Sequence, residues 1–111
     1  MAAIAFGGEL HSKVVFDRKH QFYADMPQGY QLTQKRNPIM QRGVLNFFNR
    51  NGDAAQTLIK RMQIVQDTAN QIKIDDVAYL DFNRAGMGML KIFTDNDLEH
   101  PRDASLAAKE L

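Results

Sequence analysis

The sequence has 111 residues, of which 44% are hydrophobic and 24% are charged, and its formal net charge is +1. This length predicts one domain at most, and the near-neutral charge excludes the global basic field of a dedicated nucleic-acid binder. The absence of cysteine excludes disulfides, thiolate metal sites and a cysteine nucleophile, and no apolar run is long enough for a membrane span.

The first twelve residues form an N-terminal segment. Ala2 to Phe6 are small and apolar, and Gly7-Gly8 interrupt them. The run is therefore interpreted as a short buried segment or the end of a helix. The same glycines and Glu9 cut the apolar stretch too early for a secretory signal, and Glu9 and Asp17 make it a poor transit peptide.

Residues 13–99 read as a sheet. The first predicted strand is KVVF, Lys13 to Phe16, because its centre is β-branched. Pro27 and Gly29 mark a turn, after which Leu32 and Thr33 continue as a strand. Pro38 ends that strand or keeps it at a sheet edge.

The central part of the sheet is predicted from a hairpin signal. A strand over 43–49 precedes Asn51-Gly52, the commonest two-residue hairpin pair. The next segment, TLIKRMQIVQ, fits a helical face and a strand face equally well, and the preceding hairpin favours a strand. Further strands are expected at QIKI and VAYLDF, on either side of an Asp75-Asp76 turn, and at GMLKIFT.

Residues 100–111 are predicted to form a helix. Pro101 suits a first helical turn, Asp103 suits the positive helix start, and alanine and leucine fill the remainder. The fold class expected from the sequence is therefore α+β, a mostly antiparallel sheet with a C-terminal helix, in a single domain.

No motif indicates metal binding or catalysis. His11, His20 and His100 lack partners at metal-ligand spacing, and Asp75-Asp76 reads as a turn rather than an acid–base pair. Gly86 and Gly88 lack the pattern of a phosphate loop and are interpreted as a bulge or a close backbone contact.

Three basic pairs leave two interpretations open. With Phe22, Tyr23 and Tyr30 nearby in the sequence, the pairs are either parts of an RNA-facing surface or ordinary solvated charges. The pairs are Arg18-Lys19, Lys35-Arg36 and Lys60-Arg61.

At KVVFDRKHQFYADMPQGYQLTQ and at YLDFNRAGMGMLKIFTDNDLEHPRDA, the chain resembles the GatB subunit of the bacterial and organellar tRNA-dependent amidotransferases. The resemblance implies a fragment of the catalytic domain of GatB, with PQGYQLTQ as a turn and strand beside a substrate pocket. It also implies candidate vestigial contacts to substrate or RNA. These are Arg18, Lys19, Tyr23, Asp25, Tyr30, Gln31, Asn83 and Arg84.

The departures from the family concern its chemistry, which uses ATP and Mg²⁺. Where the family has R-I-H-L-E-E-D-A-G-K, this chain has RMQIVQDTAN, so that Gln63, Val65 and Gln66 stand at the histidine and glutamate positions. Gln28 and Lys91 likewise replace a family lysine and a family glutamate. Because a divalent ion is held by carboxylates, no metal, cofactor or small-molecule substrate is expected here.

These departures lead to the hypothesis of a non-catalytic structural subunit within a larger assembly that is mitochondrial by family resemblance. A ribosome is the first expectation for that assembly, and a respiratory or ATP-synthase complex is the second. The expected partners are other protein subunits, with RNA contact possible. The alternatives are one piece of a split tRNA-dependent amidotransferase, which would be an enzyme, or a small RNA-contacting module.

Overall fold

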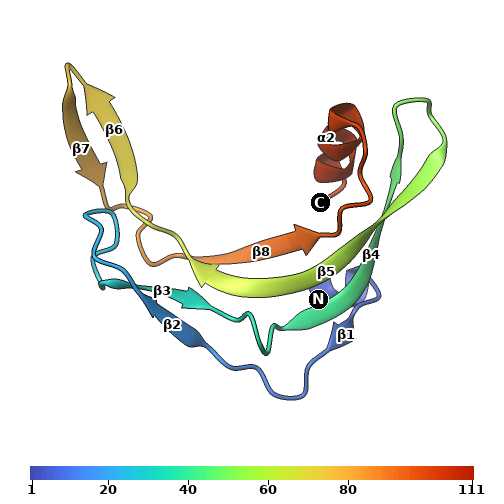
Figure 1. The fold of residues 1–111 in the computed structure, drawn as a ribbon, viewed down its shortest axis with the longest axis horizontal. Helices are drawn as coiled ribbons and strands as arrows, with labels where there is room; N and C mark the ends of the chain where they lie inside the picture. Colours follow the sequence, from blue (N-terminus) through green and yellow to red (C-terminus); the bar gives the residue numbers. More distant parts are fainter.

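The computed structural model describes residues 1–111. A four-stranded antiparallel sheet in the order β1-β4-β5-β8 is flanked by two separate two-stranded ribbons, β2-β3 and β6-β7 (Figure 1). The elements are α1 (Ala2–Ala5), β1 (Glu9–Leu10), β2 (Asp17–His20), β3 (Tyr30–Thr33), β4 (Met40–Phe48), β5 (Ala54–Gln66), β6 (Asn70–Ile74), β7 (Val77–Asp81), β8 (Gly88–Thr94) and α2 (Pro101–Lys109). The predicted α+β class, mostly antiparallel with a C-terminal helix, is confirmed.

The predicted strand at Lys13 to Phe16 is wrong, since pairing in this ribbon begins only at Asp17, which lies opposite Thr33. The residues that would continue the partner strand leave the ribbon. Gln34 is fully buried, and its side-chain Oε1 accepts a hydrogen bond from the Ile64 amide of β5, 2.6 Å away. Val15 therefore keeps a single long contact of 3.5 Å, from its amide to the Asn37 carbonyl.

The ambiguous segment after Asn51-Gly52 is a strand, β5, so the hairpin prediction is confirmed. The connection is longer than a two-residue turn, because the Oδ1 atom of Asn49 accepts from the amides of Asn51 and Asp53. The second predicted turn holds Asp75 and Asp76 at φ 47° and 61°. Positive φ at both central residues is what a tight antiparallel hairpin requires.

Strands β4 and β5 share an irregularity at their centre. Arg42 has φ 53°, and the pairing of β5 with β8 shifts between Ile59 and Arg61. In a regular strand, residues three apart point to opposite faces, but Ile59 and Met62 are both fully buried in one core. The bulge therefore keeps the apolar side chains of both halves on the same face.

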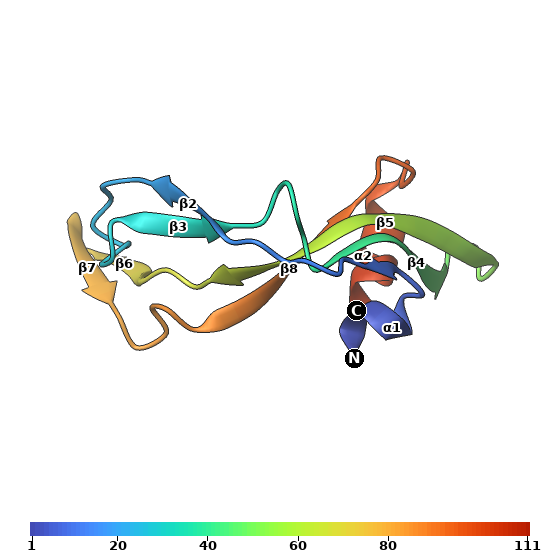
Figure 2. The ribbon, with the colours of Figure 1, turned by 90° about the horizontal axis from the view of Figure 1, so that it is seen from below.

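The core lies between that face of the sheet and the two helices. Ala3 of α1 and Ala107 of α2 pack in one cluster with Met40, Ile59 and Met62, and the helices lie on the same side of β4 and β5 (Figure 2). Only 14 of the 111 residues are buried, so most of the sheet surface is free to contact other molecules. Neither helix is long and apolar enough to cross a membrane.

Two carboxylates attach the C-terminal helix to the sheet. Asp97 accepts hydrogen bonds from the Thr57 hydroxyl at 2.6 Å and from the Leu58 amide at 2.8 Å. Asp103, in the first turn of α2, accepts from the Arg50 amide at 2.8 Å. The helix itself begins at Pro101, as predicted, and His100 caps it by accepting from the Arg102 amide through Nδ1.

The pKa of the Asp97 carboxyl reflects this anchoring. Partial burial disfavours its charge, but the hydrogen bonds from Thr57 and Leu58 outweigh burial and hold the pKa below its usual value of 3.8. A lowered folded-state pKa stabilises the fold at pH values above the unfolded pKa. This contribution is lost as the pH falls from about 3.8 through the lower folded-state pKa.

Replacing Asp97 tests the anchor. Asp97→Ala leaves the fully buried Thr57 hydroxyl without its partner, and we expect the free energy of unfolding to fall by about 1–3 kcal/mol in urea denaturation at pH 7. Glu99→Ala removes the same charge from an exposed neighbour and should change stability by less than about 0.5 kcal/mol. Equal effects of the two substitutions would contradict the anchoring role.

Candidate functional site

Three chain segments meet where β5 ends. The turn before β3 joins the segment after β5 through a hydrogen bond from the Ala69 amide to the Asp25 carbonyl, 2.8 Å long. The turn before β8 joins the same segment, because the Asp67 amide donates to the Met87 carbonyl and the Asp67 carbonyl accepts from the Gly86 amide. These backbone contacts fix all three segments around Asp67, beside the base of the β6-β7 ribbon (Figure 1).

Arg84 lies in the tight turn between β7 and β8. The Asn83 amide donates to Asp81 Oδ1, the Ala85 amide to the Phe82 carbonyl, and the Met87 amide to the Arg84 carbonyl. Overlapping bonds of this kind fix the backbone of a turn. Arg84 is thereby held on a rigid support although its own side chain is 68% exposed.

An ion pair links this turn to the end of β5. Nε of Arg84 lies 3.2 Å from Oδ2 of Asp67, whose side chain is only 25% exposed. The other carboxylate oxygen, Oδ1, accepts from the Thr68 amide at 3.0 Å, which fixes the orientation of the carboxylate. Because a guanidinium has five N–H donors, Arg84 retains donors beyond this contact.

Two adjoining hollows surround the ion pair. One, of about 360 Å³, is lined by Asp67, Thr68, Ala69, Asn70, Asp81 and Arg84. The other, of about 290 Å³, shares Asp67 and Thr68 and adds Gln31 of β3, the end of β5, and Met89 to Lys91 of β8. We call them together the paired hollow. Its formal charges, from two aspartates, one arginine and one lysine, sum to zero.

The structure brings four of the eight predicted site residues to this region. Gln31 and Arg84 line the paired hollow, Asn83 stands in the Arg84 turn, and Asp25 contributes its carbonyl to Ala69. Tyr23 is 63% exposed and lines a neighbouring hollow together with Asp25.

The remaining predicted residues lie on the β2-β3 ribbon. The guanidinium of Arg18 sits 4.6 Å from the ring centroid of Tyr30, and the His20 ring meets Tyr30 edge-on at 6.1 Å. Lys19 pairs with Gln31 across the ladder. Since cross-strand partners point to the same face, Lys19 is on the Gln31 side of the ribbon, and the Arg18–Tyr30 stack is on the other.

Other residues of the paired hollow were missed by the sequence analysis. Thr68, Asn70 and Asp81 had no assigned role, and Lys91 was noted only as a lost glutamate. Asp81 stands in the segment that carries the resemblance, which could have indicated it. Nothing in the local sequence places Lys91 in the same hollow as Asp67, because Lys91 reaches it through its pairing with Gln63 of β5. Its Nζ also lies 5.2 Å from the ring centroid of Phe93.

The basic pair in the middle of β5 is already occupied within the fold. The Arg61 guanidinium lies 3.9 Å from the ring centroid of Phe93, and Lys60 Nζ lies 3.9 Å from the Asp95 carboxylate. The interpretation of Gly88 as a close backbone contact is wrong, because no atom lies within 4 Å of a Cβ placed there. Gly86 instead has φ +83°, a left-handed turn conformation.

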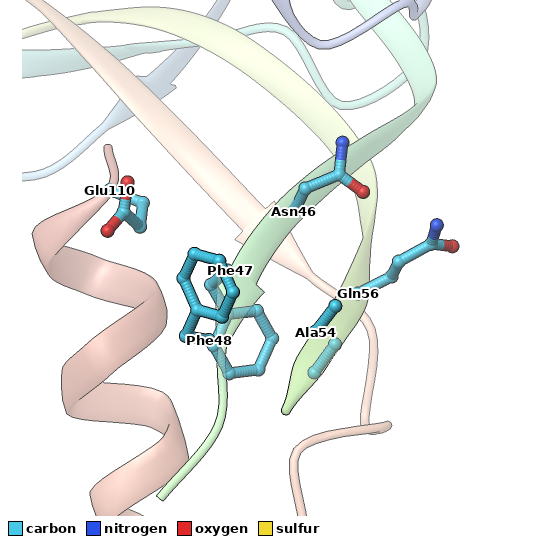
Figure 3. Close-up of a pocket in the computed structure, with 7 residues that line it drawn as sticks. Asn46, Phe47, Phe48, Ala54, Gln56 and Glu110 are labelled. Carbon is cyan, nitrogen blue, oxygen red and sulfur yellow. The ribbon is translucent and has the colours of Figure 1, made fainter. Parts of the chain in front are cut away.

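A further hollow lies at the other end of the sheet and carries little chemistry. It is lined by Phe47, Phe48 and neighbours on the β4-β5 hairpin, and Glu110 is the only titratable side chain in it. In Figure 3, Asn46 and Gln56 point away from α2. A single carboxylate beside two aromatic rings offers no recognisable constellation of acid, base or ligand.

The residues around Asp67 do not fit a magnesium site. No group of three or more histidine, aspartate or glutamate side chains converges in the structure to hold a metal ion. Asp67 is engaged by Arg84 and the Thr68 amide, while Val65, the position of a family glutamate, is apolar and buried. A hard divalent cation requires several oxygen ligands, which these residues do not supply.

Comparison with known proteins gives one family. The model of the GatB/GatE catalytic domain matches residues 1–111. The chain is 38% identical, over its whole length, to the GatB subunit of the mitochondrial glutamyl-tRNA(Gln) amidotransferase of Cryptococcus neoformans. It is 47% identical, over 81% of its length, to the GatB subunit of the aspartyl/glutamyl-tRNA(Asn/Gln) amidotransferase of Mesoplasma florum.

A third relative, from Micromonas commoda, is 40% identical over 95% of the chain and is named as a GatB subunit of a chloroplastic/mitochondrial glutamyl-tRNA(Gln) amidotransferase. The chain spans only about a fifth of the length of these relatives, which it covers to 22%, 19% and 20%. What they share with it is therefore the part of the molecule described above.

These comparisons overturn the hypothesis of a non-catalytic structural subunit of a ribosome or a respiratory complex. All three relatives are named as amidotransferase subunits, and none of the three is named as a ribosomal or respiratory protein. That hypothesis counted the charged positions changed in RMQIVQDTAN and at Gln28 and Lys91. It did not consider that Asp81, Arg84 and Lys91, from separate segments, line adjoining hollows with Asp67.

Gly86 in the Arg84 turn and Gly88, the first residue of β8, provide a matched test. Neither has an atom within 4 Å of an added Cβ, but only Gly86 has a positive φ, of +83°. We expect Gly86→Ala to lower the free energy of unfolding by about 1–2 kcal/mol, because a left-handed conformation brings Cβ against the following carbonyl. Gly88→Ala should be nearly neutral. Thermal unfolding of both variants measures the difference, and equal stabilities would show that the turn relaxes.

Proposed function

We propose that this chain, which belongs to the GatB/GatE catalytic domain family, works within a tRNA-dependent amidotransferase and contributes part of the surface that receives the aminoacyl end of the tRNA. The relatives' names give the substrate class as glutamyl-tRNA(Gln) and aspartyl-tRNA(Asn). The observation that carries the proposal is the paired hollow. It gathers charges of both signs from three segments, and its lining includes two predicted site residues, Gln31 and Arg84.

The family activity is the conversion of a carboxylate carried on tRNA to an amide. In that chemistry a protein surface binds and orients the acyl group, and positioning is a large part of catalysis. Arg84 offers donors to an oxyanion from a rigid turn, and Gln31 and Thr68 add neutral polar groups. The activating nucleotide, its metal ion and the ammonia source belong, in this proposal, to other polypeptide segments of the enzyme.

The β2-β3 ribbon supports an RNA contact beside the hollow. Gln31 on one face lines the paired hollow, and the Arg18–Tyr30 stack occupies the other face. Aromatic rings and guanidinium planes are the platforms on which unpaired bases stack. The ribbon is thus suited to the single-stranded end of a tRNA whose aminoacyl group reaches the hollow.

A mitochondrial location forms part of the proposal. The fungal relative is named as mitochondrial and the algal relative as chloroplastic/mitochondrial. Other subunits of the amidotransferase are the proposed protein partners. The largely exposed sheet, with few buried residues, is compatible with such contacts.

Purification of the tagged chain from its own source tests the proposed function. We expect other amidotransferase subunits to co-purify and the complex to convert glutamyl-tRNA(Gln) to glutaminyl-tRNA(Gln) when ATP, Mg²⁺ and an amide donor are supplied. Mass spectrometry identifies the partners, and chromatography of the released amino acid measures conversion. Partners without any amidotransferase subunit, together with no conversion, would contradict the proposal.

The RNA contact has its own test. Tyr30→Ala should weaken binding of an acceptor-stem RNA with a free CCA end by about fivefold or more at low salt, because a stacking platform is lost. Tyr79→Ala removes an exposed tyrosine from the β6-β7 ribbon, where no guanidinium stacks on it, and serves as the control. Fluorescence anisotropy gives both dissociation constants, and equal losses would assign Tyr30 no specific role.

A further inference from the structure

The paired hollow has a charge arrangement that one class of ligand matches. Two carboxylates, Asp67 and Asp81, and two cations, Arg84 and Lys91, line it. A ligand of one sign would meet like charges on entering, whereas a ligand that carries one cation and one anion can place each beside an opposite charge. The acyl group of an aspartyl or glutamyl ester is such a ligand, because it has an α-ammonium and a side-chain carboxylate.

We propose that Arg84 binds the side-chain carboxylate of the aminoacyl group and that Asp81, with Asp67, binds its α-ammonium. This inference rests on the proposed function and names the residues that recognise the acyl group of the substrate. It makes the chain selective for glutamyl and aspartyl esters over their amides and over simple anions.

The state of each charged group supports this assignment. Arg84 is 68% exposed and its contact with Asp67 uses Nε, so a ligand can reach the remaining N–H donors of the guanidinium. A guanidinium binds carboxylates through two parallel N–H donors, a geometry that a lysine cannot provide. Asp67 is fixed through the Thr68 amide, so the guanidinium is oriented before a ligand arrives.

Asp81 is suited to the ammonium. Its Oδ1 accepts from the Asn83 amide at 2.9 Å, which holds the carboxylate in place at the end of β7. The residue is half-buried, and its remaining lone pairs are open to the hollow that it lines. Asn70, from the facing strand and paired with Asp81 in the ladder, adds an amide beside it.

The same arrangement separates substrate from product. A glutamine or asparagine side chain presents an uncharged amide to Arg84, and its NH₂ group is a donor that meets other donors. Hydrogen bonds to charged groups are stronger than neutral ones, so the amide product should be held less tightly than the acid. Selective loss of affinity after amidation would assist release of the product.

Binding of small esters to the 111-residue chain tests the inference without any activity. L-Glutamate α-methyl ester keeps both charges and the ester linkage, and it is titrated against amide chemical shifts in NMR spectra. We expect saturable shifts at Thr68, Asn70 and Gly86, and binding at least about tenfold weaker for L-glutamine α-methyl ester and for glutarate monomethyl ester, which lacks the ammonium. Equal affinity for the three esters, or equal affinity for inorganic phosphate, would overturn the assignment.

Single substitutions test whether Arg84 is the residue that binds the side-chain carboxylate of the ester. Arg84→Gln should weaken binding of the glutamate ester at least about tenfold and abolish its preference over the glutamine ester, with Arg84→Lys retaining part of the affinity. Arg102→Gln removes the same charge on α2 and should leave both values unchanged. An equal loss of affinity for the glutamate ester in Arg84→Gln and Arg102→Gln would show a general effect of charge and would contradict the proposal. Thermal unfolding checks that each variant is folded.

The two proposals fail separately. Ester selectivity lost on Arg84→Gln supports the site even when the purified complex shows no amide formation, which would count against the proposed function alone. The opposite result is also possible: the complex forms the amide, but the chain shows no selective ester binding and Arg84→Gln leaves kcat/KM for glutamyl-tRNA(Gln) unchanged. That result would overturn the proposed binding site and leave the proposed function standing.

Discussion

Strand β5 is the element on which the rest of the structure depends. Its first half pairs with β4 and supplies Ile59 to the core beneath the helices. Its second half pairs with β8 and ends at Gln66, directly before Asp67. The bulge between the two halves keeps apolar side chains on the core face through the irregularity. One strand therefore sets both the position of the core and the position of the paired hollow.

Much of the fold could be predicted from local signals. The Asn51-Gly52 hairpin, the Asp75-Asp76 turn and the helix start at Pro101 follow from residues a few positions apart, and the structure has all three. The strand expected at Lys13 to Phe16 failed for a non-local reason: Gln34 is drawn onto β5, so no partner strand remains. The bulge at Arg42 and Lys60 has no local signature, because it is resolved only by packing across the sheet.

The site shows the same division between local and non-local information. The resemblance placed Gln31, Asn83 and Arg84 near a substrate. In the structure Gln31 and Arg84 line the hollows that include Asp67, and Asn83 lies in the adjacent turn. The hypothesis of a ribosomal or respiratory subunit was drawn from the lost metal ligands, and the names of the relatives contradict it. The charged side chains of a site come from several segments, and the strand register decides which of them lie in the same hollow. In this chain the pairing of β5 with β8 places Lys91 in the same hollow as Asp67.

Cross-linking would locate the aminoacyl end of a tRNA on the assembled complex. A glutamyl-tRNA(Gln) with a photoreactive terminal adenosine is cross-linked to the purified complex, and the adducts are mapped by mass spectrometry. We expect adducts within residues 28–31, 66–70 or 81–91, the segments that line the paired hollow and its ribbon. Adducts confined to the α2 end of the sheet, or to other subunits only, would contradict this expectation.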